Sequence, residues 1–281
     1  MSPALPLALQ CLAELRLSAA SALVWNAGEL FLLADDELYL QCYSLDGAFL
    51  AEHCLLDEQL PEEPLARKAL KPDFEMLCQL PQGWLLALGS GSTEQRRRAV
   101  LWRQGEARRI DLTPLYLALE AQLPQLNLEG AVVQGDRLLL AQRGNGKNAN
   151  NALISLDLPT LMTQLEGARL DSDCLRQIIP LQIGHLDGVA LTFTDLCLDL
   201  RGRLLFSATA EDTLSTYADG PCLGSALGWI DGDRVQALWP LPGAAKIEGL
   251  CMAADGSLRL INDPDDRAAR SCLYSAQLPE F

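Results

Sequence analysis

The feature that most constrains the fold is a short pattern that recurs along the whole chain. Each copy has an acidic residue that opens an apolar run, then a turn, and then a second apolar run. The copies begin near Glu75, Glu129, Asp195 and Glu248, and a fifth copy without the acid begins near Ser21. The intervals between these five residues, in chain order, are 54, 54, 66 and 53 residues. Repeats of this length are typical of folds that stack one small unit many times.

The residues of each unit indicate β-strands. The apolar runs are short, rich in Leu, Val, Phe and Trp, and interrupted by Gly, Asp and Asn, as expected of strands joined by hairpins. A third apolar strand follows in every unit, and a fourth follows in four of the five. The last unit stops at its third strand, whereas residues 7–17 form a spare strand before the first unit. We therefore predict that residues 7–17 pair with residues 272–276 and close a ring.

A closed ring of this kind removes the open sheet edges that a linear array would expose. We predict an all-β fold, a single β-propeller domain over residues 1–281 with five four-stranded blades. Six blades are an alternative, because the interval before Asp195 holds extra material, including a short helix expected at residues 158–166. A second short helix is expected at residues 114–122. The other alternative is a β-sandwich or barrel with coincidental spacing.

Composition excludes several classes of partner. The chain has 22 basic and 37 acidic residues and a formal net charge of −15, which argues against nucleic acid and against an anionic membrane surface. No uncharged apolar run reaches the roughly 18 residues of a membrane-spanning helix, and no secretory signal is evident at the start of the chain. The nine cysteines form no CxxC pair, and most lie in apolar runs, as expected of buried thiols in a reducing compartment. We expect a cytoplasmic protein.

The four repeated acids are the first candidate site. The first strand of a blade lines the central channel, so Glu75, Glu129, Asp195 and Glu248 are expected near one mouth of that channel. Carboxylates gathered there need a cation, arginine partners or raised pKa values. With only two histidines in the chain, a bound metal would have mostly oxygen ligands and would be Ca²⁺ or another divalent cation. The alternative is that each acid caps its own blade through hydrogen bonds to backbone amides or basic neighbours.

Four further residues are candidate catalytic groups. Arg143 and Lys147 follow the second strand of the third unit, so they are expected at the same mouth, where they can clamp a small anionic molecule. His185 and Asp187 lie in the link into the fourth unit, and His185 is the histidine placed to act as a general base.

The openings D-F-E, N-L-E-G, T-D-L and K-I-E-G, each followed by a G-x-L run, resemble the esterase-like and phytase-like β-propeller family. More loosely, they resemble the gluconolactonase and strictosidine-synthase propellers, and the resemblance spans nearly the whole chain. The gluconolactonase group usually has six blades and a metal over the channel held by Glu, Asn and Asp, and Glu129 resembles the opening glutamate. The resemblance implies a metal-dependent hydrolase of a small ester, lactone or phosphoester. The alternative is a non-catalytic propeller that binds a ligand or protein partner with the same face.

Overall fold

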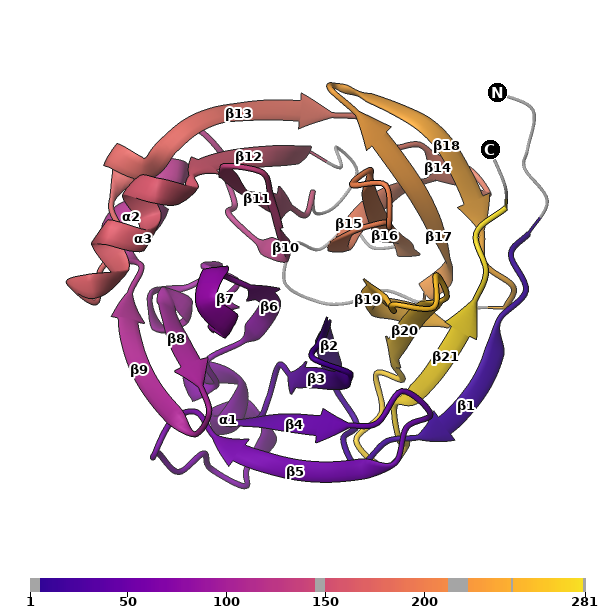
Figure 1. Ribbon diagram of the computed structural model, residues 1–281, viewed down its shortest axis with the longest axis horizontal. Helices are drawn as coiled ribbons and strands as arrows, with labels where there is room; N and C mark the ends of the chain where they lie inside the picture. Colours follow the sequence, from indigo (N-terminus) through magenta and orange to yellow (C-terminus); the bar gives the residue numbers. More distant parts are fainter. Residues whose placement is uncertain (1–5, 145–149, 212–221, 244, 280–281) are drawn as a thin grey trace.

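Five antiparallel β-sheets surround a central axis, as the computed structural model shows (Figure 1). The structure describes residues 6–144, 150–211, 222–243 and 245–279. Four sheets have four strands, and the fourth blade gains a short fifth strand. The predicted five-bladed propeller is therefore confirmed. The extra material before the fourth blade forms a helix and a hairpin rather than a sixth blade.

The blades follow one another in chain order, and each runs from the axis outward. Blade 1 contains β2 (Ala20–Asn26), β3 (Glu29–Ala34), β4 (Tyr39–Tyr43) and β5 (Phe49–Cys54). Blade 2 contains β6 (Phe74–Gln79), β7 (Leu85–Gly89), β8 (Arg98–Arg103) and β9 (Glu106–Asp111). Blade 3 contains β10 (Leu128–Gln134), β11 (Arg137–Gln142), β12 (Asn151–Asp157) and β13 (Leu175–Leu181).

The last two blades depart slightly from this plan. Blade 4 contains β15 (Val189–Leu198), β16 (Leu204–Glu211), β17 (Cys222–Asp231) and β18 (Arg234–Pro240), and the two-residue strand β14 (His185–Leu186) pairs with the start of β15. Blade 5 contains β19 (Lys246–Met252), β20 (Leu258–Asp263), β21 (Cys272–Ala276) and, as its outer strand, β1 (Gln10–Glu14).

The predicted ring closure is confirmed. Strand β1 pairs antiparallel with β21, with Gln10 opposite Ser275 and Glu14 opposite Cys272. The two ends of the described chain therefore lie side by side on the outside of the ring (Figure 1). The N-terminal strand completes the last blade, so β21 is not an open sheet edge.

Three short α-helices lie between strands, and local sequence explains where two of them begin. Helix α1 (Pro64–Leu70) starts with proline, and the Glu63 side chain accepts hydrogen bonds from the first backbone amides. Helix α3 (Leu158–Glu166) is capped by Asp157, and both α3 and α2 (Thr113–Glu120) have proline in the first turn. Both helices predicted from the sequence are thus confirmed. Short 3₁₀ turns occupy the following segments: Pro81–Gly83, Glu94–Arg96 and Ser172–Cys174.

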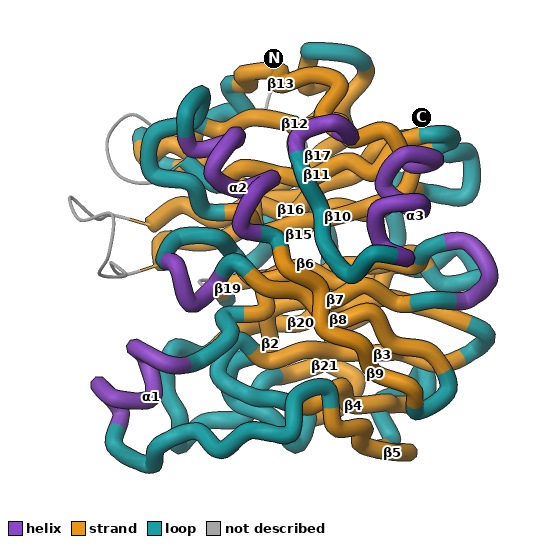
Figure 2. The backbone as a smooth tube through the Cα atoms, turned by 90° about the vertical axis from the view of Figure 1, so that its left-hand side faces the viewer, coloured by secondary structure: helices purple, strands orange, loops and turns teal. Residues whose placement is uncertain are grey.

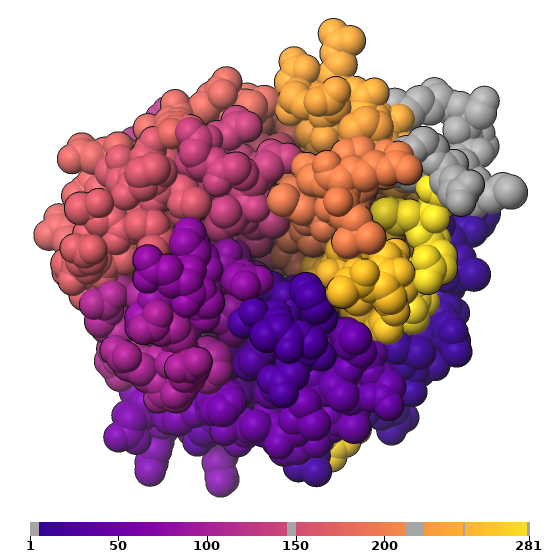
Figure 3. Space-filling view, viewed as in Figure 1, coloured from indigo at the N-terminus to yellow at the C-terminus, as the bar shows by residue number. Residues whose placement is uncertain are grey.

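The core consists of five apolar clusters, most of them shared between neighbouring blades. The largest contains leucines of blades 2 and 3 together with the buried faces of α2 and α3. Both helices lie on the outside of the ring (Figure 1). Helix α1 lies instead at one end of the ring (Figure 2). The opposite end is the face seen in Figure 3, where the blades surround a central hollow.

The inner strand of every blade carries a β-bulge at the same place. The ladder between the first and second strands skips one residue in each blade, and these residues are Ser21, Glu75, Glu129, Thr194 and Glu248. A bulge kinks a strand and redirects the side chain of the unpaired residue. In addition, the inner strands of adjacent blades contact one another around the whole ring. The five bulge residues therefore form one layer near the axis.

A glycine after the bulge permits the close approach of neighbouring inner strands. A Cβ atom on Gly130 would lie 2.8 Å from the backbone nitrogen of Leu196 in the next blade. A Cβ on Gly249 would lie 2.8 Å from the Ile261 side chain and 3.1 Å from that of Leu23. The repeated E-G pair therefore has a structural reason: the glutamate occupies the bulge, and the glycine leaves room for the adjacent strand.

Candidate functional site

The bulge layer contains two kinds of residue. In blades 1 and 4 the bulge residue is a hydroxyl that joins neighbouring blades. The Ser21 Oγ donates to the Phe74 carbonyl oxygen over 2.5 Å, and the Thr194 Oγ1 donates to the Ile247 carbonyl oxygen over 2.7 Å. In the other three blades the bulge residue is glutamate. Three of the four predicted acids, Glu75, Glu129 and Glu248, thus lie in one layer around the axis.

Arg143 joins two of these glutamates. Its Nη1 lies 3.5 Å from Glu129 Oε2 and 3.7 Å from Glu248 Oε1, and its Nη2 lies 2.8 Å from Glu211 Oε1. The Asn127 amide also donates to Glu129 Oε1 over 2.6 Å. All three carboxylates and the guanidinium are almost fully buried. The prediction that Arg143 lies on the same face as Glu129 and Glu248 is confirmed.

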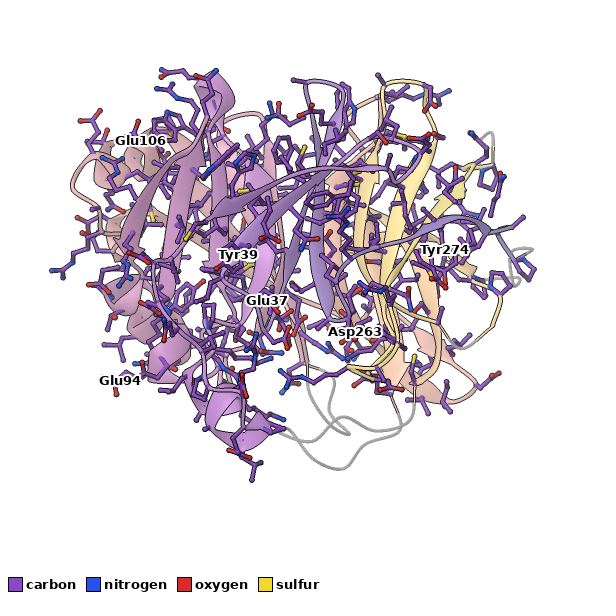
Figure 4. The ribbon with its side chains drawn as sticks, turned by 90° about the horizontal axis from the view of Figure 1, so that it is seen from below. Glu37, Tyr39, Glu94, Glu106, Asp263 and Tyr274 are labelled. Atoms are coloured by element: carbon purple, nitrogen blue, oxygen red, sulfur yellow. The ribbon has the colours of Figure 1, made fainter. Side chains whose placement is uncertain are left out.

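Lys246 extends the same network into blade 5. Its Nζ lies 3.3 Å from Glu248 Oε1 and 3.6 Å from Glu211 Oε1. The same ammonium also pairs with Asp265 at 3.0 Å and lies 3.9 Å from Asp263. Asp263 and Glu37 point toward the same end of the ring, whereas Glu106 lies toward the opposite end (Figure 4).

A second group of charges surrounds Glu75. The carboxylates of Asp35, Asp73 and Glu75 offer oxygen atoms that all lie within 4.8 Å of one another. Lys71 pairs with Asp35 and lies 2.8 Å from Asp73, and Arg96 lies 2.8 Å from the other oxygen of Asp73. No ion pair of Glu75 occurs among the residues that the structure describes.

We call the two groups together the central cluster. It comprises eight acids and four bases: Asp35, Asp73, Glu75, Glu129, Glu211, Glu248, Asp263 and Asp265, with Lys71, Arg96, Arg143 and Lys246. The two groups also influence each other. The charge of Glu129, in the Arg143 group, raises the pKa of Glu75, as does the charge of Asp73 in the same group as Glu75. Acids outnumber bases two to one, so some carboxyl groups must be protonated or bind a cation.

Burial raises the pKa of several carboxyl groups in the cluster. Burial raises the pKa of Glu129 to about 8, against the opposing charge of Arg143. Burial also raises the pKa of Glu75 well above its usual range, and the charge of Glu129 adds to this. Asp263 is similar, with burial raising its pKa to about 8 although Lys246 lowers it. Near neutral pH the cluster therefore contains proton-bearing carboxyl groups beside two buried cations.

Asp195, the fourth predicted acid, has a different position. The bulge of blade 4 falls on Thr194, so the assignment of Asp195 to the equivalent position was wrong by one residue. Its two oxygens accept hydrogen bonds from the backbone N–H of Leu196 at 2.7 Å and of Leu250 at 2.9 Å. It is 1% exposed, and burial raises its pKa well above the usual range. Asp195 thus binds backbone amides, as the blade-capping alternative expected, but it joins blade 4 to blade 5 rather than capping blade 4 alone.

This arrangement predicts a large structural effect at Asp195. Replacing Asp195 by alanine leaves two buried amides without acceptors, and each costs about 1–3 kcal/mol. We expect Asp195→Ala to lower the free energy of unfolding by about 2–6 kcal/mol in urea titrations. Asp195→Asn keeps one acceptor and should lose about half as much. An alanine variant as stable as the parent chain would show that these two hydrogen bonds contribute nothing.

The other predicted catalytic residues are not brought into the cluster. His185 and Asp187 lie on the exposed hairpin formed by β14 and the start of β15. No hydrogen bond or ion pair between either side chain and the cluster occurs within the described parts of the chain. The hairpin pairs His185 with Ala190 and Leu186 with Val189, so its paired residues on β15 all precede the bulge at Thr194. Lys147 lies outside the described residues.

The site residues predicted from the sequence did not include the two lysines of the cluster, Lys71 and Lys246, or five of its acids, Asp35, Asp73, Glu211, Asp263 and Asp265. Asp73 and Lys246 each lie two residues before a bulge glutamate, as does Asn127, so all three occupy the same position of their repeats. The alignment of Asp73 and Lys246 with Asn127 in the repeat could have identified both residues as part of the site. Glu211 ends the second strand of blade 4, and the end of that strand is expected at the same mouth, as for Arg143. Lys71 has no such signal, because its place depends on how neighbouring blades pack.

Comparison with known protein families assigns the chain to one of them. The family model DUF6929, described as a family of unknown function, matches residues 16–278. The chain belongs to DUF6929. A search of curated proteins finds no match to this DUF6929 chain. None of the helices in the described ranges of the DUF6929 chain has the length and apolar character needed to cross a membrane.

Solved structures with a similar fold are β-propellers of low sequence identity. Glutaminyl cyclase of Myxococcus xanthus matches with a TM-score of 0.55 and 11% identity, over 99% of this chain and 100% of that chain. A glucose dehydrogenase matches with a TM-score of 0.51 and 13% identity, over 97% and 100%. Hydrazine synthase of Kuenenia stuttgartiensis reaches only 0.44 at 10% identity, and the match covers 89% of this chain and 58% of that chain. At these identities the similarity shows that the DUF6929 chain has a propeller fold, and nothing more specific.

Proposed function

We propose that the central cluster is the active site of a hydrolase that acts on a small ester or lactone. Glu129 is the acid–base group, and Arg143 stabilises negative charge. The observation that carries this proposal is the environment of Glu129: a buried carboxyl that lies 3.5 Å from a guanidinium and has a pKa raised to about 8. Carboxyls with pKa values near the working pH are efficient proton donors and acceptors.

The chemistry divides among three groups. Water attacks the carbonyl carbon, and Glu248 accepts its proton at Oε1, a buried oxygen that lies 3.3 Å from Lys246 Nζ and 3.7 Å from Arg143 Nη1. Arg143 stabilises the oxyanion that forms on the carbonyl oxygen. The protonated Glu129 then gives its proton to the leaving alcohol oxygen as the carbon–oxygen bond breaks. The products are a carboxylic acid and an alcohol, and the protons balance when Glu248 returns its proton to Glu129 through solvent.

The net charge of the cluster restricts the class of substrate. The four bases are already engaged by acids, and the acids are in excess. A phosphoester or another small anion would meet net negative charge, so we favour a neutral ester or lactone. The resemblance to esterase-like propellers supports the same class. The fold is also compatible with catalysis, since the similar solved propellers include enzymes.

A divalent cation such as Ca²⁺ fits the structure less well. Asp35, Asp73 and Glu75 have the oxygen ligands that hard cations prefer, and their oxygens lie within 4.8 Å. However, the ammonium of Lys71 contacts Asp35 and lies 2.8 Å from Asp73. The Lys71 ammonium thus already supplies the positive charge that a metal ion would bring to Asp35 and Asp73. The Arg143 guanidinium supplies it in the same way between Glu129 and Glu248. No step of the proposed reaction passes through a metal.

The test is a screen of small esters, lactones and phosphoesters with and without EDTA. We expect ester or lactone hydrolysis that resists EDTA and that falls by about 10²–10⁴-fold in Glu129→Gln, since the amide cannot carry the proton. The matched control is Glu106→Gln, which changes an exposed glutamate at the opposite end of the ring and should leave the rate unchanged (Figure 4). Activity lost with EDTA and restored by Ca²⁺ would support the metal-dependent alternative instead.

A non-catalytic binding propeller is the second candidate. The observation that favours it is the pairing of every base in the cluster with carboxylates, which is common in structural ion-pair networks. Under this reading the parent chain hydrolyses nothing in the screen. Glu129→Gln would then change thermal stability but no rate.

A further inference from the structure

Two cysteines from opposite ends of the chain lie beside each other where the ring closes. Cys11 is on β1 and pairs with Tyr274, and Cys272 is two residues before Tyr274 on β21. Residues two apart on a strand point to the same face, so Cys11 and Cys272 form a diagonal pair on one face of the ladder. The Cys272 thiol has the Cys11 thiol and the Tyr274 hydroxyl as its neighbours.

Both thiols are accessible to a small molecule. Cys11 is exposed and Cys272 is half-buried, and neither is in a disulfide. By contrast, Cys42, Cys78, Cys174, Cys197 and Cys251 are buried. Cys11 and Cys272 are therefore two accessible thiols that lie close to each other on adjacent strands.

We propose that Cys11 and Cys272 are a redox modification site, at which a low-molecular-weight disulfide converts the two thiols into a disulfide that locks the ring shut. The exposed Cys11 thiolate attacks one sulfur of the small disulfide and releases its first thiol. The Cys272 thiolate then attacks the Cys11 sulfur of the mixed disulfide and releases the second thiol. Two electrons pass from the protein to the small disulfide, and the two protons leave on the two released thiols.

The geometry allows this bond after a small movement. Diagonal residues on antiparallel strands are about 7–8 Å apart, whereas disulfide-bonded Cα atoms are usually about 4.4–6.8 Å apart. Strand β1 is the outer strand of blade 5, so it has only one neighbour in the sheet, and its ladder is already irregular between Cys11 and Ala13. An outer strand with a bulge can shift toward β21 without disturbing the inner strands.

The consequence is a covalent ring. Cys11 and Cys272 are 261 positions apart, so the bond encloses almost the whole chain. Cross-links that close long loops restrict the unfolded chain most strongly. The bond also prevents β1 from detaching. Without the bond, an outer terminal strand such as β1 is the part of the ring that opens most readily.

The test uses the full chain and oxidised glutathione. We expect peptide mapping to find a Cys11–Cys272 cross-link, with faster migration in a non-reducing denaturing gel. The melting temperature should rise by at least about 5 °C and return to its original value with dithiothreitol. Cys11→Ser and Cys272→Ser should each abolish the cross-link and the rise. Cys54→Ser, which removes another exposed cysteine, should leave both unchanged.

Three results would overturn the proposal. Glutathione attached separately to Cys11 and Cys272 after complete oxidation would show that the two thiols do not reach each other. A cross-link between other cysteines would place the site elsewhere. A Cys11–Cys272 cross-link that leaves the melting temperature unchanged would show that the bond does not lock the ring.

Discussion

Replacing Arg143 by methionine is expected to destabilise the protein by about 3–5 kcal/mol near pH 8, because it leaves buried carboxylates without their cation. Arg143 is 8% exposed and faces Glu129, Glu211 and Glu248 at 3.5, 2.8 and 3.7 Å. Methionine keeps much of the length of the side chain but none of the charge. Urea unfolding measures the change, provided the slope with denaturant stays constant.

The loss should depend on pH in a defined direction. Burial raises the pKa of Glu129 to about 8 in the folded chain, above its value of 4.5 in the unfolded chain. A raised carboxyl pKa contributes stability that is fully present below the unfolded pKa and is lost as the pH rises through the folded pKa. The Arg143→Met variant should therefore be closest to the parent chain near pH 5 and furthest from it above pH 8.

A matched control is Arg176→Met. Arg176 also pairs with two acids, Asp136 and Asp157, but its side chain is 34% exposed. Water screens ion pairs at the surface, so they contribute little to stability, and Arg176→Met should cost far less than Arg143→Met. If Arg143→Met and Arg176→Met cost the same, the carboxylates around Arg143 do not need its charge.

Removing residues 1–17 is expected to unfold the protein or make it aggregate. The deletion removes β1 and three buried leucines, Leu7, Leu15 and Leu17. Burial of each leucine stabilises the fold by about 1.5–3 kcal/mol, so the loss of about 4–9 kcal/mol approaches the whole stability of a typical domain. The deletion also exposes the edge of β21, which can then pair with another chain.

Size-exclusion chromatography and thermal unfolding check this prediction. A shorter deletion of residues 1–5 keeps Leu7 and every paired residue of β1, so it should stay monomeric and melt close to the full chain. A chain without residues 1–17 that stays monomeric and melts at the same temperature would show that the closure contributes little.

Much of the fold could be predicted because it follows from local patterns. The apolar runs and their turns give the strands, the repeat gives the blade count, and the missing fourth strand of the last unit gives the closure by β1. Helix α3 was predictable in the same way, from Asp157 as a cap and proline in the first turn. These features need only the chain itself and the rule that sheet edges must be covered.

The site was only partly predictable, and the reason is the bulge. Thr194 and Asp195 are adjacent polar residues, and the sequence does not show which of them the ladder skips. A shift of one residue sends a side chain in a different direction, so Asp195 binds backbone amides while Thr194 joins the layer. Lys246 was missed for another reason: a lysine at the start of a strand resembles a surface residue, and only ring packing buries it.

The central claim is that the cluster holds a proton-carrying glutamate at Glu129, and one titration tests it most directly. NMR of chains with isotope-labelled glutamate carboxyl carbons follows each group with pH, and the signal lost in Glu129→Gln identifies Glu129. The structure predicts that this carboxyl titrates near pH 8, because it is buried beside Glu248 and only partly compensated by Arg143. A Glu129 carboxyl that titrates near its ordinary value of 4.5 would contradict the account, because the proton needed for acid catalysis would then be absent at neutral pH.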